Sequence, residues 1–189
     1  MIWLSYICLI LLVARTVKGT GSLSDFNNPA LQFELGRAHG LNSTAILPHD
    51  MLQRIQSGAE LGNRDNIYFL GLLKMYGISL QVSARGALEN FRKAANLGLP
   101  EAMTAFGMCA YSGIGMDKDD IVAISWFRKA ANAQDVNGYW LLAKMLMEGE
   151  GVATPNHPEA AVYFQMAADQ QIPQAEHHLA IMFEYGLGV

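Results

Sequence analysis

The stretch "LPEAMTAFGMCAYSGIG", residues 99–115, decides the fold because the chain repeats it. Two later segments end on the same spaced pair of glycines: "VNGYWLLAKMLMEGEG", residues 136–151, and "IPQAEHHLAIMFEYGLG", residues 172–188. The final glycines, Gly115, Gly151 and Gly188, are 36 and 37 residues apart. A fixed period of this length predicts stacked helical hairpins.

A second set of segments recurs between the first, with the same spacing. It comprises "ALENFRKAANLG" from Ala87, "AISWFRKAANAQ" from Ala123 and "AAVYFQMAADQQ" from Ala160. Phe91, Phe127 and Phe164 each precede a pair of alanines, which gives an aromatic wedge beside a flat face suited to close helix packing. In the first segments a large residue precedes a small one, at 70–71, 106–107, 142–143 and 179–180. No run sustains the alternation of a strand. We therefore predict an all-α, right-handed α-solenoid of helix-turn-helix repeats.

The spaced glycines raise the question of a phosphate-binding loop. A phosphate fingerprint follows a strand and has a third glycine that opens a helix, whereas here a helix comes first and the pair recurs in every unit. The glycines are predicted to be structural turns that end the first helix. They are Gly77, Gly113, Gly115, Gly149, Gly151, Gly186 and Gly188.

The acidic loop "DKDD", residues 117–120, does not fit a calcium site. A helix–loop–helix calcium loop needs glycine at its sixth position and glutamate at its twelfth, but counting from Asp117 these are Val122 and Arg128. Asp119 or Asp120 is instead expected to cap the second helix. Pro158, shortly after Asn156, suits a first helical turn.

The first 14 residues, "MIWLSYICLILLVA", carry no charged side chain and are followed by Arg15 and Lys18. The run is too short to span a membrane as a helix, and it resembles the apolar region of a secretory signal peptide. Residues 1–19 are predicted to be a cleaved signal peptide, with a signal anchor as the alternative. Residues 20–63 are predicted to be a lead-in and a degenerate first repeat, with "MLQRIQSGAELG", 51–62, as its second helix.

Charge and cysteine content restrict the function further. Without residues 1–19 the chain has 11 Lys and Arg against 17 Asp and Glu, a net charge of −6, which offers no electrostatic footprint for nucleic acid. Cys109 is then the only cysteine left and is expected to be a small buried hydrophobe. "NST" at 42–44 makes Asn42 an acceptor for N-glycosylation in a secreted chain.

The repeat resembles the Sel-one-like repeat (SLR) family, which is related to tetratricopeptide repeats. "AMTAFGMCAYSGIGMDKDDIVAISWFRKAA", residues 102–131, matches its pattern of alanines, glycine pair, acidic loop and W-aromatic-x-K-A-A second helix. The resemblance covers residues 64–189 clearly, as three repeats and an incomplete last one, and 30–62 weakly. It implies an adaptor that holds other proteins. A subset of the family lies in the endoplasmic reticulum lumen, in the degradation of misfolded proteins, and the predicted signal makes that subset the nearest analogy.

No constellation of residues supports an enzyme. The histidines, His39, His49, His157, His177 and His178, lack metal-ligand spacing, and no Ser-centred elbow or carboxylate pair is present. We expect no catalytic residue, no metal and no cofactor. The alternatives are a secreted hydrolase of the SLR type and, if residues 1–19 are not a signal, a cytosolic signalling adaptor.

One stripe on the first helices is the candidate binding surface. Residues at the third, seventh and tenth places of each unit share a face at helical spacing, and in stacked units they would line the inner, concave surface. Aromatic residues and methionines are typical binding anchors. The predicted anchors for an extended segment of a partner protein are Tyr68, Leu72, Met108, Tyr111, Trp140 and Met147. The alternative is that the stripe belongs to the core between repeats.

The last unit contains a first helix and a turn, "YGLGV", without a second helix. Leu179, Met182, Phe183 and Tyr185 are expected to need a cover there, because exposed apolar side chains forfeit burial energy. Three explanations are open: a fragment of a longer array, completion by a partner, or self-association through this end. Membrane contact is expected only through a partner or an uncleaved signal anchor.

Overall fold

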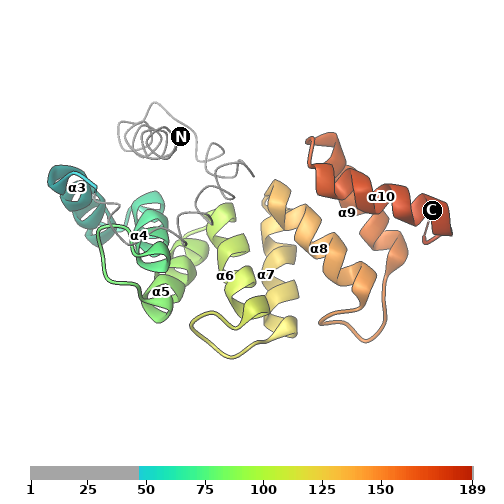
Figure 1. Ribbon diagram of the computed structural model, residues 1–189, viewed down its shortest axis with the longest axis horizontal. Helices are drawn as coiled ribbons and strands as arrows, with labels where there is room; N and C mark the ends of the chain where they lie inside the picture. Colours follow the sequence, from blue (N-terminus) through green and yellow to red (C-terminus); the bar gives the residue numbers. More distant parts are fainter. Residues whose placement is uncertain (1–46, 189) are drawn as a thin grey trace. The chain divides into compact units, whose positions relative to one another are not determined.

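The computed structural model describes residues 47–188, which form eight α-helices and no strand, so the all-α prediction is confirmed for this range (Figure 1). The helices are α3 (His49–Glu60), α4 (Arg64–Tyr76), α5 (Ala84–Asn96), α6 (Pro100–Ser112), α7 (Asp120–Asn132), α8 (Val136–Glu148), α9 (His157–Asp169) and α10 (Pro173–Tyr185). Helix α3 lies where the second helix of the degenerate repeat was predicted. The predicted signal at 1–19, Asn42 and the first helix of that repeat lie outside the described residues.

The first compact part of the chain extends to Ala94 and contains α3, α4 and most of α5. Its core consists of Leu47, Ile55, Phe69, Leu73 and Ile78. Gly71 on α4 faces the ring of Phe91 on α5, and a Cβ atom at Gly71 would lie 2.7 Å from Phe91 Cε1. The small residue after the large one in the repeat therefore makes room for the aromatic wedge.

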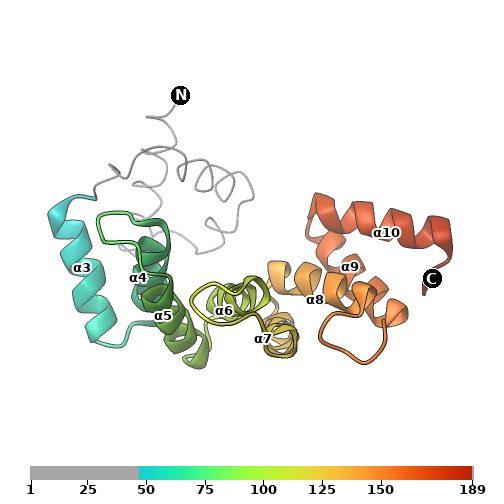
Figure 2. The same cartoon turned by 60° about the horizontal axis from the view of Figure 1, so that its bottom comes forward.

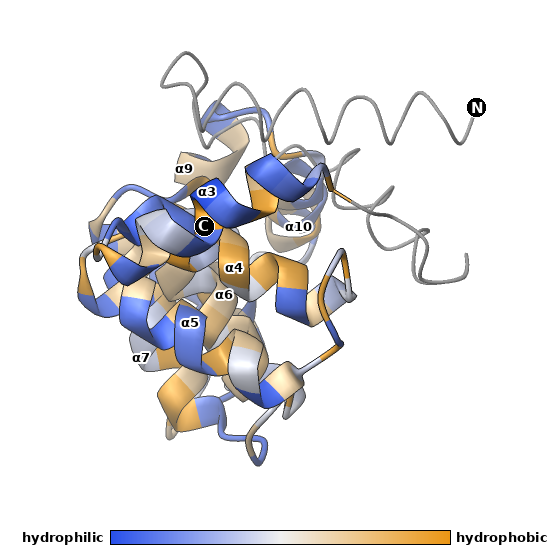
Figure 3. Cartoon of the chain, turned by 90° about the vertical axis from the view of Figure 1, so that its left-hand side faces the viewer, coloured by the Kyte–Doolittle hydropathy of each residue, from blue (hydrophilic) through white to orange (hydrophobic). Residues whose placement is uncertain are grey.

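The second part begins at Ala95 and contains α6 to α10. Helix α6 packs on α7, α8 packs on α7 and α9, and α10 packs on α9 (Figures 1 and 2). Hydrophobic and hydrophilic residues are interspersed along the helices (Figure 3). Phe127 and Phe164 are almost completely buried beside Ala131 and Ala167. The predicted aromatic wedges are thus confirmed as core residues.

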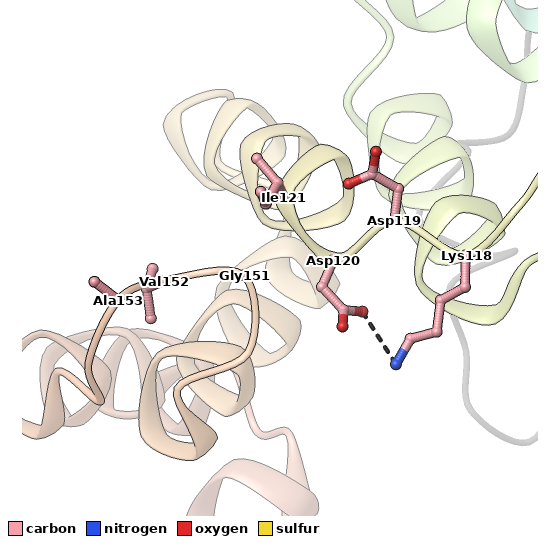
Figure 4. Close-up of a pocket in the computed structure, with 7 residues that line it drawn as sticks. All are labelled: Lys118, Asp119, Asp120, Ile121, Gly151, Val152 and Ala153. Atoms are coloured by element: carbon pink, nitrogen blue, oxygen red, sulfur yellow. Dashed lines mark ion pairs between the residues drawn. The ribbon is translucent and has the colours of Figure 1, made fainter.

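The turn between the two helices of a unit uses its two glycines differently. Gly113 and Gly149 are left-handed and end α6 and α8, as do Gly77 for α4 and Gly186 for α10. The second glycine makes a close backbone contact: a Cβ atom at Gly151 would lie 2.4 Å from the carbonyl oxygen of Asp120, at the start of α7. Figure 4 shows this turn beside Asp120 and Ile121.

The same contact recurs at the other turns described within one part. A Cβ atom at Gly188 would lie 2.4 Å from the carbonyl carbon of His157, at the start of α9. In the first part Ser79 stands in the glycine position with a positive φ of 57°, and its hydroxyl accepts a hydrogen bond from the backbone N–H of Leu47. The second turn residue thus contacts the start of the preceding unit's second helix at Gly151 and Gly188, and the residues just before that helix at Ser79.

Side-chain caps begin the helices at the places that the sequence indicated. Asp119 caps α7 by accepting a hydrogen bond from the Val122 N–H at 2.9 Å, which confirms the capping prediction. Asn156 caps α9, where Pro158 lies in the first turn. Such caps satisfy backbone donors that have no partner within the helix.

Asp135 caps α8 from a buried position that the sequence did not indicate. One carboxylate oxygen accepts hydrogen bonds from the Gly138 N–H at 2.8 Å and from the Thr104 hydroxyl at 2.6 Å. Burial raises the pKa of Asp135, although both hydrogen bonds favour its charged form and partly offset the increase.

This raised pKa predicts the sign of a pH effect on stability. Above the ordinary carboxyl pKa the folded chain holds the Asp135 proton more tightly than the unfolded chain does, so the contribution of Asp135 to stability falls as pH rises toward its native pKa. We expect the advantage of the parent chain over Asp135→Asn to shrink between pH 4 and pH 7, measured by urea unfolding. Asp119→Asn controls for the loss of a charge at a helix start. An advantage that grows with pH would contradict the prediction.

Candidate functional site

The six predicted anchors are divided between the two parts of the chain. Tyr68 and Leu72 lie on α4, in the first part, whereas Met108 and Tyr111 lie on α6 and Trp140 and Met147 lie on α8, in the second. Met108, Tyr111, Trp140 and Met147 therefore lie within the same compact part of the chain. They define the candidate surface, which we call the α6–α8 surface.

Tyr68 belongs to the core rather than to a binding surface. Its side chain is only 4% exposed, and its ring lies 5.6 Å from that of Phe91 and 6.2 Å from that of Phe69. Thr104, at the same place in the next unit, is also buried, where it donates its hydrogen bond to Asp135. The core alternative therefore holds for the third place on α4 and α6, because helix packing covers it there. Leu72 is half-buried and packs against the core of the first part.

The α6–α8 surface is partly open to solvent and joins two helices. Met108 is 48% exposed, and Tyr111 is half-buried. Lys144 of α8 donates a hydrogen bond to the Tyr111 hydroxyl at 3.4 Å, and its ammonium lies 5.4 Å from the centre of the Tyr111 ring. This contact brings the tenth place of one unit beside the seventh place of the next. The predicted stripe is therefore continuous between α6 and α8.

Two lysine side chains lie close to the Tyr111 ring. Lys118, in the loop after α6, places its ammonium 5.2 Å from the ring centre and pairs with Asp120 at 3.2 Å. Burial lowers the pKa of Lys144, but the hydrogen bond to Tyr111 and the charges of Glu148 and Glu150 outweigh this effect, so its pKa is raised. Lys144 is therefore charged at neutral pH and is attracted to the face of the ring. Helical spacing could not have found Lys118, because it lies in the loop.

Trp140 extends the surface toward α10. Its side chain is half-buried, and its ring meets that of His178 edge-on with the centres 6.5 Å apart. His178 in turn stacks on Phe164 at 5.0 Å. The ring that contacts Trp140 is that of His178 and not that of His177, which occupies the third place of the last unit. Met147 is also half-buried and packs against the core.

The described residues contain no group of three or more His, Cys, Asp or Glu side chains that could hold a metal ion. Cys109 is buried and free, and burial raises its pKa to about 11, so its thiol stays protonated at neutral pH.

An open hollow lined by Lys118, Asp120, Ile121 and the turn 151–153 lies at the start of α7 (Figure 4). The ion pair between Lys118 and Asp120 at this hollow is partly exposed to solvent. In the range 47–188 no helix has the length and apolar character needed to cross a membrane.

These helix pairs and turns define a helical-repeat solenoid. The Sel1 repeat model matches residues 67–99, 100–135, 136–171 and 173–189, and the chain therefore belongs to the Sel1 repeat family. The matches include α6 to α10 and so the whole α6–α8 surface. Comparison with the curated proteins gave no match.

Three solved structures are similar to the chain. The first is a Sel1 repeat protein from Oxalobacter formigenes, with 23% sequence identity and a TM-score of 0.70, and the match covers 86% of this chain and 63% of that one. The second is c5321, a protective antigen present in uropathogenic Escherichia coli strains that displays an SLR fold, with 25% identity, a TM-score of 0.72, and coverage of 95% of this chain and 37% of that one. The third is the cysteine-rich protein B of Helicobacter pylori, with 18% identity, a TM-score of 0.54, and coverage of 68% of this chain and 96% of that one. The chain thus spans less than two thirds of the first two proteins. The similarity confirms the SLR-type solenoid fold.

Proposed function

We propose that the chain is a non-catalytic scaffold for protein–protein interaction, and that the α6–α8 surface binds an extended segment of a partner protein. The observation that carries this proposal is that the ammonium groups of Lys118 and Lys144 lie 5.2 and 5.4 Å from the centre of the Tyr111 ring, with Met108 exposed on the same helix. Membership of the Sel1 repeat family supports the same function.

The chemistry of this surface suits a protein segment. Tyrosine, tryptophan and methionine supply large contact areas with either few or easily adapted conformations. The contacts of Tyr111 with Lys144 and of Trp140 with His178 hold both rings before a partner arrives. Side chains that are already ordered lose less conformational entropy on binding.

Substitution of the anchors tests the proposal. Trp140→Ala is expected to abolish partner capture from a lysate while helical content, measured by circular dichroism, stays intact. Met108→Ser removes an exposed anchor that the fold does not need, and it should weaken capture of the same partner by at least about tenfold. Met166→Ser on α9, which exposes a similar fraction of its side chain, is the matched control. Equal capture by all variants, or unfolding of Trp140→Ala together with normal capture by Met108→Ser, would exclude this surface.

We further propose that the scaffold acts in the secretory pathway, in an endoplasmic reticulum quality-control or degradation complex. The support is the uncharged apolar run at 1–14, the acceptor Asn42 and the resemblance to the luminal subset of the family.

Mass spectrometry of the protein from its host tests the location. We expect a mature chain that begins at or close to residue 20, with a glycan on Asn42 where the host glycosylates. Retention of residues 1–19 in a membrane fraction would indicate the signal anchor. A chain that starts at Met1 in a cytosolic fraction, without a glycan, would contradict the proposal and favour a cytosolic adaptor.

A further inference from the structure

Helix α9 carries apolar side chains on the face that it turns to solvent. Val162 is 54% exposed and Met166 is 43% exposed. They are four residues apart, so they lie on the same side of the helix, one turn from each other. The opposite side of α9 is fixed in the core, where Phe164 and Ala167 are fully buried together with Met182 of α10. This burial of Met182 corrects the expectation that it needs a cover.

The equivalent places on the other second helices, α5 and α7, are polar. In the alignment of the repeats, the places of Val162 and Met166 are taken by exposed polar side chains: Glu89 and Lys93 on α5, and Ser125 and Lys129 on α7. The fold therefore does not need apolar side chains at these places. Apolar side chains gathered on one exposed face indicate a contact surface more than single ones do.

Further repeats do not cover this face. On α7 the same places, Ser125 and Lys129, are exposed although α8, α9 and α10 follow along the chain. A helix that continued the array would pack on α10 as α9 packs on α8, and it would leave the outward face of α9 in solvent. The exposure of Val162 and Met166 is therefore a property of α9 itself.

The C-terminal end of α9 is negative, and no basic side chain of the helix balances it. The carbonyl groups at the end of a helix carry a partial negative charge, which a Lys or Arg in the last turn offsets. Helices α5 and α7 have Lys93 and Lys129 there, whereas α9 has no basic residue. Asp169 adds a full negative charge three residues after Met166, at a place that is asparagine on α5 and α7. Gln165 donates a hydrogen bond to Asp169 at 2.7 Å but leaves this charge in place.

We propose that the outward face of α9, made of Val162, Met166 and Asp169, docks a segment of a partner protein that carries apolar side chains beside a Lys or Arg. The apolar side chains cover Val162 and Met166, and the cation lies at Asp169 and the negative end of the helix. This face belongs to the second helix of a unit, whereas the α6–α8 surface belongs to first helices. It is therefore a second site of the proposed scaffold.

The charge of this region argues against a second copy of the chain as the occupant. Helices α9 and α10 each contain two acidic residues and no Lys or Arg. Two copies that met through this face would bring like charges together, which weakens association. A basic segment meets the opposite charge instead.

The helical peptide LKKLLKLLKKLLKL, labelled with fluorescein, is the probe, because it presents leucine and lysine side chains on adjacent faces. We expect saturable binding to the full chain by fluorescence anisotropy. Added salt should weaken this binding, because it screens the attraction between lysine and the acidic face. A control peptide with glutamate in place of every lysine should not bind.

The repeat itself supplies the test variant. The double substitution Val162→Ser and Met166→Lys gives α9 the side chains that α7 has at the same places, so the fold should persist. It should weaken peptide binding about tenfold or more, as for the loss of central anchors. Asp169→Asn should weaken binding about twofold to fivefold and reduce its dependence on salt. Leu61→Ser, at an apolar residue of the first part that is 88% exposed, should leave binding unchanged.

Four results would overturn the proposal. The first is the absence of saturable binding to the folded parent chain. The second is equal binding by the parent and by the double variant when both have the same helical content. The third is equal binding of the lysine and glutamate peptides, which would remove the requirement for a basic segment. The fourth is a dimer in sedimentation that the double variant dissociates, which would make a second copy the occupant.

Two single variants distinguish failure of this site from failure of the α6–α8 surface. Trp140→Ala should abolish capture at the α6–α8 surface and leave peptide binding unchanged. Met166→Ser should weaken peptide binding and leave capture at the α6–α8 surface unchanged.

Discussion

Replacing Gly151 by alanine is expected to lower the free energy of unfolding by about 2–5 kcal/mol. A left-handed backbone costs a residue with a Cβ atom about 1–2 kcal/mol, and Gly151 has a φ of 70°. The added methyl group would also lie 2.4 Å from the Asp120 carbonyl oxygen, which belongs to backbone at the start of α7 and cannot turn aside. Forcing an atom into a packed contact costs about 1–3 kcal/mol more.

Gly186→Ala separates these two costs. Gly186 has a similar φ of 63°, but no atom lies within 4 Å of the position that its Cβ would take. We expect this substitution to cost only the backbone term, about 1–2 kcal/mol. Both variants are measured by urea unfolding of the full chain, followed by circular dichroism at 222 nm. Equal losses for the two would show that the contact with Asp120 contributes nothing.

The period of the sequence predicted the helices because each unit must bury one apolar stripe, and the spacing of that stripe is visible in the residues. Phe127 and Phe164 were therefore recognised as core residues without a structure. The close contact of Gly151 was not recognised. This contact depends on the approach of two segments that are distant in the sequence. A glycine that is required because there is no room for a Cβ atom cannot be distinguished in the sequence from one that is required because the backbone has a positive φ.

Other features of the fold leave no sequence signal. Gln134 and Gln171 have φ values of 62° in the short turns between units, although glutamine has no particular tendency to be left-handed. Each closes the end of a helix, where the N–H of the following residue donates a hydrogen bond to a carbonyl in the last turn, Asp135 to Ala130 and Ile172 to Ala167. Asp135 carries the signature of a helix cap, but only the structure shows that Thr104 lies over it and that burial raises its pKa.

The candidate surface was predictable to the extent that it follows helical spacing. Met108, Tyr111, Trp140 and Met147 lie on the helices where the stripe placed them. Helical spacing does not distinguish Tyr68 from Trp140, because both are aromatic residues at the third place of a unit. Only the packing in the structure shows that Tyr68 is buried and that Trp140 is half-buried.

Replacing Phe127 by alanine is expected to lower the free energy of unfolding by about 3–5 kcal/mol, the range for removal of a buried aromatic side chain. Phe127 is 1% exposed, and its Cε1 atom would lie 2.7 Å from a Cβ atom at Gly107. Because Gly107 has no side chain, the α6 residue directly against the ring cannot fill the space that the ring leaves. The cavity therefore stays open, and the loss should be at the upper end of this range.

Trp126→Ala is the matched control for this prediction. Trp126 precedes Phe127 on α7 and is a larger aromatic residue, but it is half-buried, with Phe106 at 5.0 Å on one side and the Lys129 ammonium 3.8 Å from its ring centre. Its removal opens a space that water can enter, so we expect a loss of about 1–2 kcal/mol. A larger loss at Trp126 than at Phe127 in urea unfolding would mean that the wedge of the second helix is not what holds α6 and α7 together.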